Sequence, residues 1–312
     1  MEGAAIATAV VVLVVSVTMA LVVGGCLTRK PSRFSWHSQR ILVTGGSHGV
    51  GRALVTELLL KSPDLSLIVV DREPPTDPIT DPQLVFVQHD LESGTYKGVF
   101  YGSQGEALKA LVADVVATHG VPTALVNNAG TVVGKYLTDL SDSDMNHTLS
   151  VNLLAPMILS RELVKTWIAA AAGSQPSAAK GHLVHVGSAA GLVGLAWLTD
   201  YCASKFALLG FHEALRQELR NTTIKTSIVC PAHIGTRLFA SVVNYYPWIA
   251  PTLTPEQVAS AITGILERDQ DADVWLPWFS WNALIVRAVP VWVNDLGHKL
   301  MRANEFKPDP PF

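Results

Sequence analysis

A glycine-rich turn near the start of the chain constrains the fold most strongly. The segment Thr44-Gly-Gly-Ser-His-Gly49-Val-Gly51 follows the apolar run 41–44 and precedes a helix-forming stretch at 50–61. Glycines at these positions let the backbone approach a charged group, and the amino terminus of the following helix favours an anion such as a pyrophosphate. The strand before the turn and the helix after it separate such a turn from glycines placed by chance. The sequence therefore predicts a dinucleotide-binding strand–turn–helix unit.

Short branched-chain runs alternate with longer helical stretches from Arg40 onward. The predicted strands are 41–44, 67–70, 84–87, 124–126, 182–186, 226–229 and 273–276. The predicted helices lie near 50–61, 104–119, 141–171 and 199–220, and surface loops are expected at 72–82 and 172–180. This alternation is typical of an α/β fold, a doubly wound (Rossmann) parallel sheet with helices on both faces. Binding residues are then expected at the carboxyl ends of the strands.

Acidic residues follow the second and third predicted strands. Asp71 lies about twenty residues beyond Gly51, where a carboxylate accepts the adenosine ribose hydroxyls and repels a 2′-phosphate. Arg72 would instead attract that phosphate, so NAD is the preferred cofactor and NADP the alternative. Asp90 either hydrogen-bonds the adenine or caps a turn.

The segment Tyr201-Cys-Ala-Ser-Lys205 lies thirteen residues after Ser188. If it is helical, Tyr201 and Lys205 project from the same face. A phenol ordinarily has a pKa of about 10, and a neighbouring positive charge favours the phenolate and lowers that pKa. Tyr201 is therefore predicted to act as a general acid or base, with a nicotinamide cofactor carrying the hydride between an alcohol and a carbonyl.

Together these segments resemble the short-chain dehydrogenase/reductase superfamily over about residues 38 to 277. The motifs that carry the resemblance are Thr44-Gly45-x-x-x-Gly49-x-Gly51, Asn127-Asn128-Ala129-Gly130, Asn152, Ser188, Tyr201-x-x-x-Lys205 and Pro231-Ala-His-Ile-Gly-Thr236. The resemblance implies four catalytic residues, Asn152, Ser188, Tyr201 and Lys205. It implies cofactor contacts from Gly45, Ser47, His48, Gly49, Val50, Gly51, Asp71, Asp90, Asn128, Ala129, Gly130, Tyr201, Lys205, Pro231, Ile234 and Thr236, and no metal. Ala232 departs from the glycine usual in the family.

The resemblance also implies a role for each catalytic residue. Tyr201 is the acid/base, and Lys205 lowers its pKa and holds the nicotinamide ribose. Ser188 hydrogen-bonds the substrate oxygen, Asn152 supports a water-linked proton relay, and Thr236 contacts the nicotinamide end. Taken alone, Ser188 could equally cap a turn and Asn152 could be a buried helix amide. His185 and His233 are interpreted as structural histidines.

The amino-terminal residues form a segment that is distinct in composition from the predicted domain. Residues 4–26 are apolar and uncharged, long enough to cross a bilayer of about 30 Å as a helix. We expect a membrane anchor at 1–27 and a linker at 28–39, with a cleavable signal as the alternative. Arg29, Lys30 and Arg33 follow the span, which by the positive-inside rule places the body of the protein on the cytosolic side. The expected membrane is that of the endoplasmic reticulum or a lipid droplet.

The predicted dinucleotide-binding domain covers 40–277 and includes a substrate lid at about 237–255, which contains Tyr245, Tyr246 and Trp248. The segment 278–312 is rich in tryptophan and apolar residues. It is expected either to lie at a membrane interface or to pack as a carboxyl-terminal helix on the sheet or on another subunit, as in a homodimer.

An anchored enzyme with an aromatic lid indicates a lipophilic small-molecule substrate. The sequence is similar to the membrane-bound branch that includes retinol and 17β-hydroxysteroid dehydrogenases, which implies a retinoid, steroid or long-chain lipid alcohol. The alternatives are a 3-ketosphinganine-type reductase using NADPH, or a non-catalytic membrane-tethered nucleotide-binding scaffold. A net charge of −3 without a basic run argues against nucleic acid, and the three cysteines have no paired spacing.

Overall fold

The structure is a computed structural model. It describes residues 34–172, 179–239 and 251–300, apart from 278, 279, 281, 282, 284–286 and 288. The described residues from Ser35 onward belong to one compact unit. The predicted domain boundaries at 27, 39 and 277 stay predictions.

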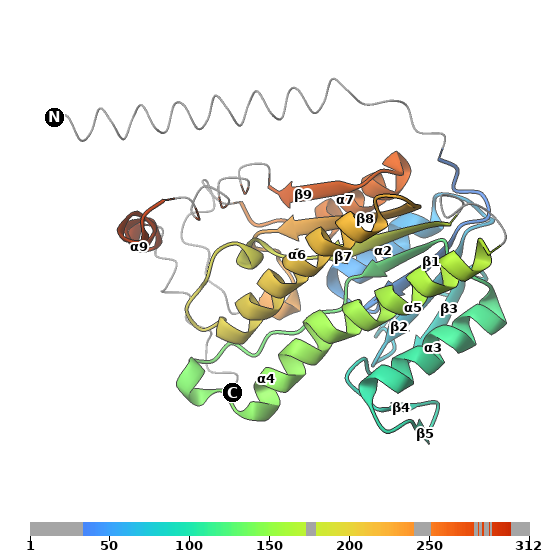
Figure 1. The fold of residues 1–312 in the computed structure, drawn as a ribbon, viewed down its shortest axis with the longest axis horizontal. Helices are drawn as coiled ribbons and strands as arrows, with labels where there is room; N and C mark the ends of the chain where they lie inside the picture. Colours follow the sequence, from blue (N-terminus) through green and yellow to red (C-terminus); the bar gives the residue numbers. More distant parts are fainter. Residues whose placement is uncertain are drawn as a thin grey trace. The chain divides into compact units, whose positions relative to one another are not determined.

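Seven parallel strands form one twisted sheet in the order β3-β2-β1-β6-β7-β8-β9 (Figure 1). The strands are β1 Arg40–Thr44, β2 Ser66–Asp71, β3 Leu84–Gln88, β6 Ala124–Asn127, β7 Lys180–Val186, β8 Thr223–Pro231 and β9 Ala272–Leu276. In the register, Thr44 pairs with Val70 of β2 and with Asn127 of β6. The glycine turn, Asp71 and Asn128 therefore leave the sheet at the same edge.

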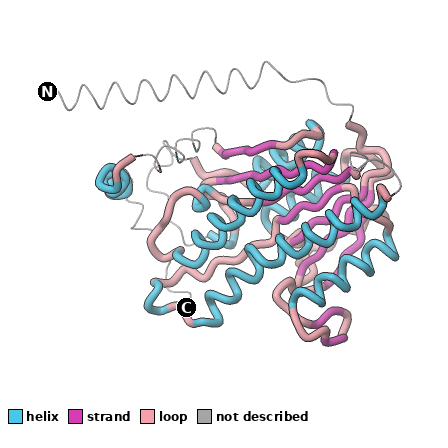
Figure 2. The backbone as a smooth tube through the Cα atoms, viewed as in Figure 1, coloured by secondary structure: helices cyan, strands magenta, loops and turns pink. Residues whose placement is uncertain are grey.

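Helices cover both faces of this sheet (Figures 1 and 2). One face carries α2 Gly49–Leu59 and α7 Pro255–Arg268, and the other carries α3 Gln104–His119, α5 Ala155–Ala170 and α6 Thr199–Leu219. Two remaining helices, α4 Asp142–Leu149 and α9 Val291–Leu300, precede α5 and follow β9. The predicted doubly wound parallel sheet is confirmed.

Each face of the sheet has its own apolar core. On the α2/α7 side, side chains such as Val43, Leu54 and Ile262 are fully buried, and on the other side so are Leu42, Leu108 and Leu163. Because both faces of the central strands are buried, the strands are apolar without alternation, as parallel strands between two helical layers require.

The prediction of one continuous helix over 141–171 is wrong. The structure breaks this stretch into α4, a π-helical segment η2 at Ser150–Leu154, and α5. Pro156 stands in the first turn of α5 and has no N–H to donate, so the regular hydrogen-bond ladder cannot continue through it. The widened turn carries Asn152.

Two elements have no counterpart in the prediction. The helix α7 opens with a capping box in which Thr254 and Gln257 each bond the other's backbone. A small antiparallel hairpin of β4 Thr95–Tyr96 and β5 Val99–Phe100 lies between β3 and α3.

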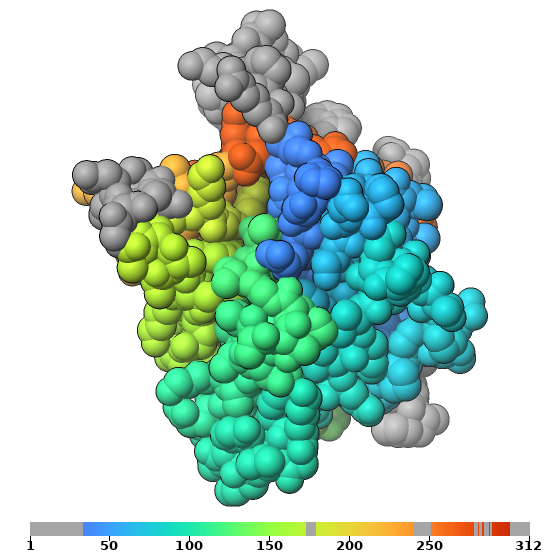
Figure 3. Space-filling view, turned by 90° about the vertical axis from the view of Figure 1, so that its right-hand side faces the viewer, coloured from blue at the N-terminus to red at the C-terminus, as the bar shows by residue number. Residues whose placement is uncertain are grey.

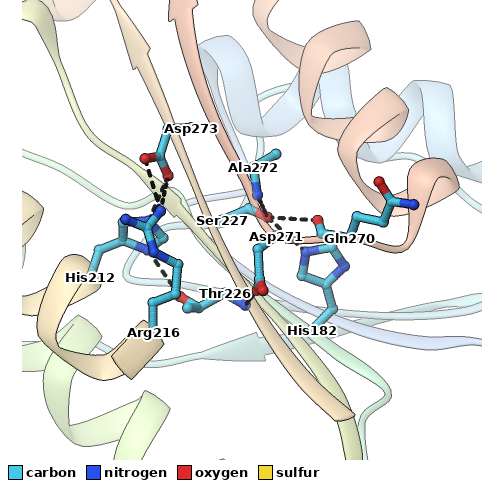
Figure 4. A network of polar contacts seen from close by, with 9 residues as sticks. All are labelled: His182, His212, Arg216, Thr226, Ser227, Gln270, Asp271, Ala272 and Asp273. Carbon is cyan, nitrogen blue, oxygen red and sulfur yellow. Dashed lines mark hydrogen bonds and ion pairs between the residues drawn. The ribbon is translucent and has the colours of Figure 1, made fainter. Parts of the chain in front are cut away.

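A polar network holds the carboxyl-terminal half of α6 to the sheet (Figure 4). His212 is fully buried, with Nδ1 3.0 Å from Thr226 Oγ1 on β8 and Nε2 2.9 Å from Asp273 Oδ1 on β9. Arg216 donates to both oxygens of Asp273 at 2.9 Å. These contacts fix the rotation and height of α6, the helix that carries Tyr201 and Lys205 at its other end.

The edge where the strands begin faces the viewer in Figure 3, and residues just after position 34 lie there beside the α7 region. Trp36 Nε1 donates to Glu267 Oε1 at 3.2 Å, and Lys61 Nζ lies 3.0 Å from the same oxygen. These contacts tie the entry into β1 to the end of α7.

Within the described ranges, no helix is both long and apolar enough to span a bilayer. The predicted anchor at 1–27 lies outside these ranges, as do residues 240–250 of the predicted lid.

Candidate active site

A cavity of about 470 Å³ opens at the carboxyl edge of the sheet. Its walls come from the glycine turn, the ends of β2, β3, β6 and β7, helix α6 and the segment after β8. This is the edge at which doubly wound sheets bind ligands. The cavity holds Tyr201 and Lys205 together with the turn at Gly45–Val50.

The glycine turn is packed too tightly for side chains. A Cβ placed on Gly51 would lie 2.0 Å from the Gly45 carbonyl oxygen and 2.6 Å from Asn128 Nδ2. Gly45 and Gly49 have φ angles of +70° and +53°, which side chains disfavour. Asn128 braces the turn by donating Nδ2 to the Gly45 carbonyl at 2.8 Å. The sequence thus needs glycine here for both conformation and packing.

The amino terminus of α2 is open to an anion. Its capping residue, His48, makes no side-chain cap hydrogen bond, and the first turn contains no acidic residue. The first N–H groups of a helix without such a cap seek another acceptor. The methyl carbon of Thr236 lies 3.4 Å from the point where a Cβ on Gly49 would be. Thr236 therefore packs directly on the glycine turn, next to a helix terminus that suits a pyrophosphate.

Acidic groups gather at the far end of this cradle. Asp71, at the end of β2, accepts from the Ser47 backbone N–H through Oδ2 at 2.9 Å. Arg72 Nε lies 3.4 Å from Glu73 Oε1, so its charge is already paired. Asp90 lines the cavity, and its Oδ1 also accepts from the Glu92 N–H at 3.1 Å. Asp90 therefore caps this turn, as one of its two predicted roles requires. Because it also lines the cavity, the predicted hydrogen bond to the adenine stays a prediction.

Asn152 is buried in the π-helical segment η2, and both ends of its amide are engaged. Its Oδ1 accepts from the Thr131 N–H at 2.8 Å, and its Nδ2 donates to the Thr131 carbonyl at 2.9 Å and to Ser204 Oγ at 3.1 Å. Asn152 thus fixes the chain just after Gly130 against α6. π-Helical turns of this kind are frequent at functional sites.

Ser188 follows β7 and lies beside Tyr201 in the cavity wall. Its Oγ accepts from the Ala190 N–H at 3.1 Å, which caps the short helix Ala189–Gly191, and the same side chain acts to lower the pKa of the Tyr201 phenol. Ser188 can therefore cap this turn and also lie beside the phenol of Tyr201.

Tyr201 lies in the first turn of α6 and is 4% exposed. Burial raises the pKa of its phenol to about 12, although the hydrogen bond from Ser188 acts in the opposite direction. The prediction that Lys205 brings this pKa below its ordinary value is wrong. The removal of the phenol from water dominates its pKa.

Lys205 is 4% exposed and one helical turn after Tyr201. Its Nζ donates to the Val186 carbonyl at 2.9 Å and lies 5.7 Å from the centre of the Tyr201 ring. Burial lowers the pKa of this amine to about 8. The two side chains share one face of the helix, as their spacing predicts.

Two histidines of β7 lie away from the cavity. His185 is fully buried, its Nδ1 lies 3.2 Å from Asn127 Nδ2, and burial lowers its pKa to about 3. Burial lowers the pKa of His182 to about 4. These rings are neutral parts of the core at physiological pH.

The family model of short chain dehydrogenases matches residues 39–246. The chain belongs to the short-chain dehydrogenase family. It is 30% identical to epidermal retinol dehydrogenase 2 of Mus musculus over 257 residues, which cover 80% of this chain and 77% of that protein. It is 31% identical to human 17-beta-hydroxysteroid dehydrogenase 13 over 230 residues, covering 72% of this chain and 71% of that protein.

Among solved structures, 4-hydroxyisoleucine dehydrogenase complexed with NADH has a TM-score of 0.63 and 25% identity to this chain. The match covers 77% of this chain and 98% of that one. The predictions of a short-chain dehydrogenase and of an NAD(P)-dependent enzyme acting on alcohols or ketones are confirmed.

In this short-chain dehydrogenase, most of the predicted site residues line one cavity. They are Gly45, His48, Gly49, Val50, Asp71, Asp90, Asn128, Ala129, Gly130, Ser188, Tyr201, Lys205, Pro231, Ile234 and Thr236. Ser47, Gly51 and Asn152 do not line it. Ser47 Oγ donates to the Glu73 carbonyl at 2.7 Å, Gly51 packs against Gly45, and Asn152 lies behind Gly130. These three residues support the wall instead of forming its surface.

Thr44 was not predicted as a site residue of this dehydrogenase. Its Oγ1 accepts from the N–H groups of Asn128 and Ala129, both at 3.1 Å, and so joins β1 to β6 below the turn. Its position at the strand end was a usable signal. Arg237 and Phe239 line the cavity from the short helix η5, Arg237–Phe239, at the start of the predicted lid. The lid prediction covers these two residues but assigns neither of them a contact.

Proposed function

We propose that this enzyme interconverts a lipophilic alcohol and its carbonyl, with Tyr201 as acid/base. The observation that carries the proposal is the apolar environment of the phenol. Tyr201 is buried in a cluster with Ala190 and Cys202, and five partly buried apolar side chains pack against that cluster: Val132, Leu195, Leu198, Phe206 and Phe239. Of these five side chains Phe239 lines the cavity, and an apolar wall beside the proton donor suits a substrate that is largely hydrocarbon.

The names of two relatives point in the same direction. One is named a retinol dehydrogenase and another a 17-beta-hydroxysteroid dehydrogenase. A retinoid, steroid or long-chain lipid alcohol is therefore the substrate class that we propose for this chain.

When bound, a nicotinamide cofactor supplies or accepts the hydride. The residues of the chain move and orient the proton. Tyr201, protonated at neutral pH, donates its phenolic proton to a carbonyl oxygen in reduction, and Ser188 hydrogen-bonds the same oxygen. In oxidation Tyr201 must become a phenolate, and the buried ammonium of Lys205 stabilises that charge. Asn152 holds the chain after Gly130 against α6, the helix that carries Tyr201 and Lys205.

We propose NAD as the preferred cofactor. The cavity end near β2 carries the carboxylate of Asp71, and Arg72 is paired with Glu73. A 2′-phosphate would meet Asp71 and would have to displace Glu73 from Arg72. A ribose diol instead finds an acceptor in Asp71.

We also propose that residues 4–26 anchor the enzyme in a membrane, with the catalytic domain on the cytosolic side. The support is the sequence: an uncharged apolar segment followed by Arg29, Lys30 and Arg33. The endoplasmic reticulum or a lipid droplet is the proposed site, and a homodimer is proposed from the family resemblance.

The test is an activity screen of the full-length protein in detergent, with NAD and with NADP. All-trans-retinol, estradiol and a long-chain alkanol are compared with ethanol and glycerol, and NADH formation is followed by fluorescence. The proposal expects turnover of at least one lipophilic alcohol and a higher kcat/KM with NAD. Activity confined to the water-soluble alcohols would reject the substrate class. Cofactor binding without turnover of any alcohol or the matching ketone would favour a scaffold.

A further inference from the structure

Arg237 is a cation in the cavity wall that has no polar partner among the residues the structure describes. Three lysines or arginines line the cavity in the described part of the chain. Arg72 is paired with Glu73, and Lys205 donates to the Val186 carbonyl. Arg237 is exposed, and its guanidinium makes no hydrogen bond or ion pair with the described residues. A guanidinium in this state is available for an anionic ligand.

The position of Arg237 places it near the phosphate cradle. It follows Thr236 directly, and the Thr236 methyl lies 3.4 Å from a Cβ position on Gly49. The segment after β8 therefore packs on the glycine turn, and Arg237 lies at the edge of the predicted phosphate cradle. Planar guanidinium groups bind phosphate oxygens with paired hydrogen bonds.

The same short helix reaches the catalytic tyrosine. The helix η5 comprises three residues, Arg237–Phe239, and the Phe239 N–H bonds the Thr236 carbonyl at 3.1 Å. The Phe239 ring packs edge-to-face on Tyr201, with centroids 5.7 Å apart and planes at 80°. One turn of chain thus connects the phosphate side of the cavity to the apolar wall at the reacting phenol.

We propose that Arg237 binds the pyrophosphate of the dinucleotide and thereby fixes η5, so that cofactor binding sets the position of Phe239 against Tyr201. The proposal rests on the function proposed above, because it requires a dinucleotide in the cavity. Arg237 is a binding and positioning residue, and the glycine turn supplies the opposite half of the phosphate site.

The test compares Arg237→Gln with the wild-type full-length protein in detergent. Dissociation constants are measured calorimetrically for ADP, which carries the pyrophosphate, and for adenosine, which lacks it. The expected result is about a 10- to 150-fold weaker binding of ADP, the range for one charge-assisted hydrogen-bonded contact, with adenosine changed less than about twofold. The ADP affinity of the variant should also depend less on salt concentration. Arg220→Gln is the matched control, because Arg220 is exposed at the end of α6 and does not line the cavity.

Hydrogen exchange tests the coupling to η5. ADP should slow exchange in a peptide covering 234–239 in the wild type, while adenosine should not, and Arg237→Gln should lose this protection. Equal ADP affinity in wild type and variant would overturn the proposal, and so would an equal loss of ADP and adenosine binding. Failure of the wild type to bind either ligand would instead overturn the proposed function.

Discussion

Lys205 donates through Nζ to the backbone carbonyl of Val186, 2.9 Å away, and so holds its charge beneath the Tyr201 ring, 5.7 Å from the ring centre. This bond joins α6 to the last residue of β7, two positions before Ser188. It fixes the lysine where a phenolate would benefit from its charge, while burial raises the pKa of the phenol and favours its protonated form.

Replacing Tyr201 with Phe should abolish proton transfer while leaving the cavity intact. We expect turnover to fall by about two to four orders of magnitude, the usual range for a positioned acid/base, with NADH affinity changed little. Steady-state rates and NADH fluorescence titration measure the two quantities. Tyr136→Phe is the control, because Tyr136 stacks on Trp197 and does not line the cavity. Undiminished turnover in Tyr201→Phe would remove Tyr201 from the mechanism.

Replacing Asp71 with Ala should change the choice of cofactor. The variant loses the carboxylate that accepts from the Ser47 N–H and is proposed to bind the adenosine ribose, and it should no longer repel a 2′-phosphate. We expect the ratio of kcat/KM for NAD over NADP to fall about tenfold or more, a difference of about 1.4 kcal/mol. Asp77→Asn, outside the cavity lining, is the control. An unchanged ratio would show that Asp71 does not select the cofactor.

Replacing Gly51 with Ala should damage the phosphate cradle. The new methyl would lie 2.0 Å from the Gly45 carbonyl oxygen, so the turn or α2 must shift. We expect a loss of about 1–3 kcal/mol in the free energy of unfolding together with weaker NADH binding. Gly210→Ala is the matched control, because no atom lies within 4 Å of its added Cβ and it stands in the exposed part of α6. That change should stabilise the protein by up to about 1 kcal/mol. Urea unfolding compares the two, and equal effects would contradict the packing argument.

Buried histidine should make the protein acid-sensitive. Burial lowers the pKa of His182 from 6.5 to about 4, so between these pH values the unfolded chain binds a proton that the folded chain does not. The free energy of unfolding therefore falls as the pH falls through this window, by about 3 kcal/mol from this residue. His182→Gln should show a shallower pH dependence in urea unfolding at pH 6.5, 5.5 and 4.5. A slope equal to that of the wild type would contradict the lowered pKa.

Local patterns predicted the elements that depend on local forces. The strand–turn–helix at 40–59 follows from an apolar run and glycines, and the predicted helix at 104–119 has the observed bounds. The four-residue spacing of Tyr201 and Lys205 places them on one helix face, a property of helical geometry alone. The break of the predicted helix at η2 and the hairpin at 95–100 were not predicted, because no residue repeat near them distinguishes these turns from regular structure.

The sequence by itself determined which residues meet at the carboxyl edge of the sheet, because strand ends in a parallel sheet share one edge. Only the tertiary structure decided how deeply those residues are buried and which groups they contact there. Whether the Tyr201 phenol is more or less acidic than in water depends on how completely other segments cover it, and these include Val132, the segment 190–198 and Phe239. Burial and the partners of Lys205 and Asn152 are non-local quantities, so spacing cannot supply them.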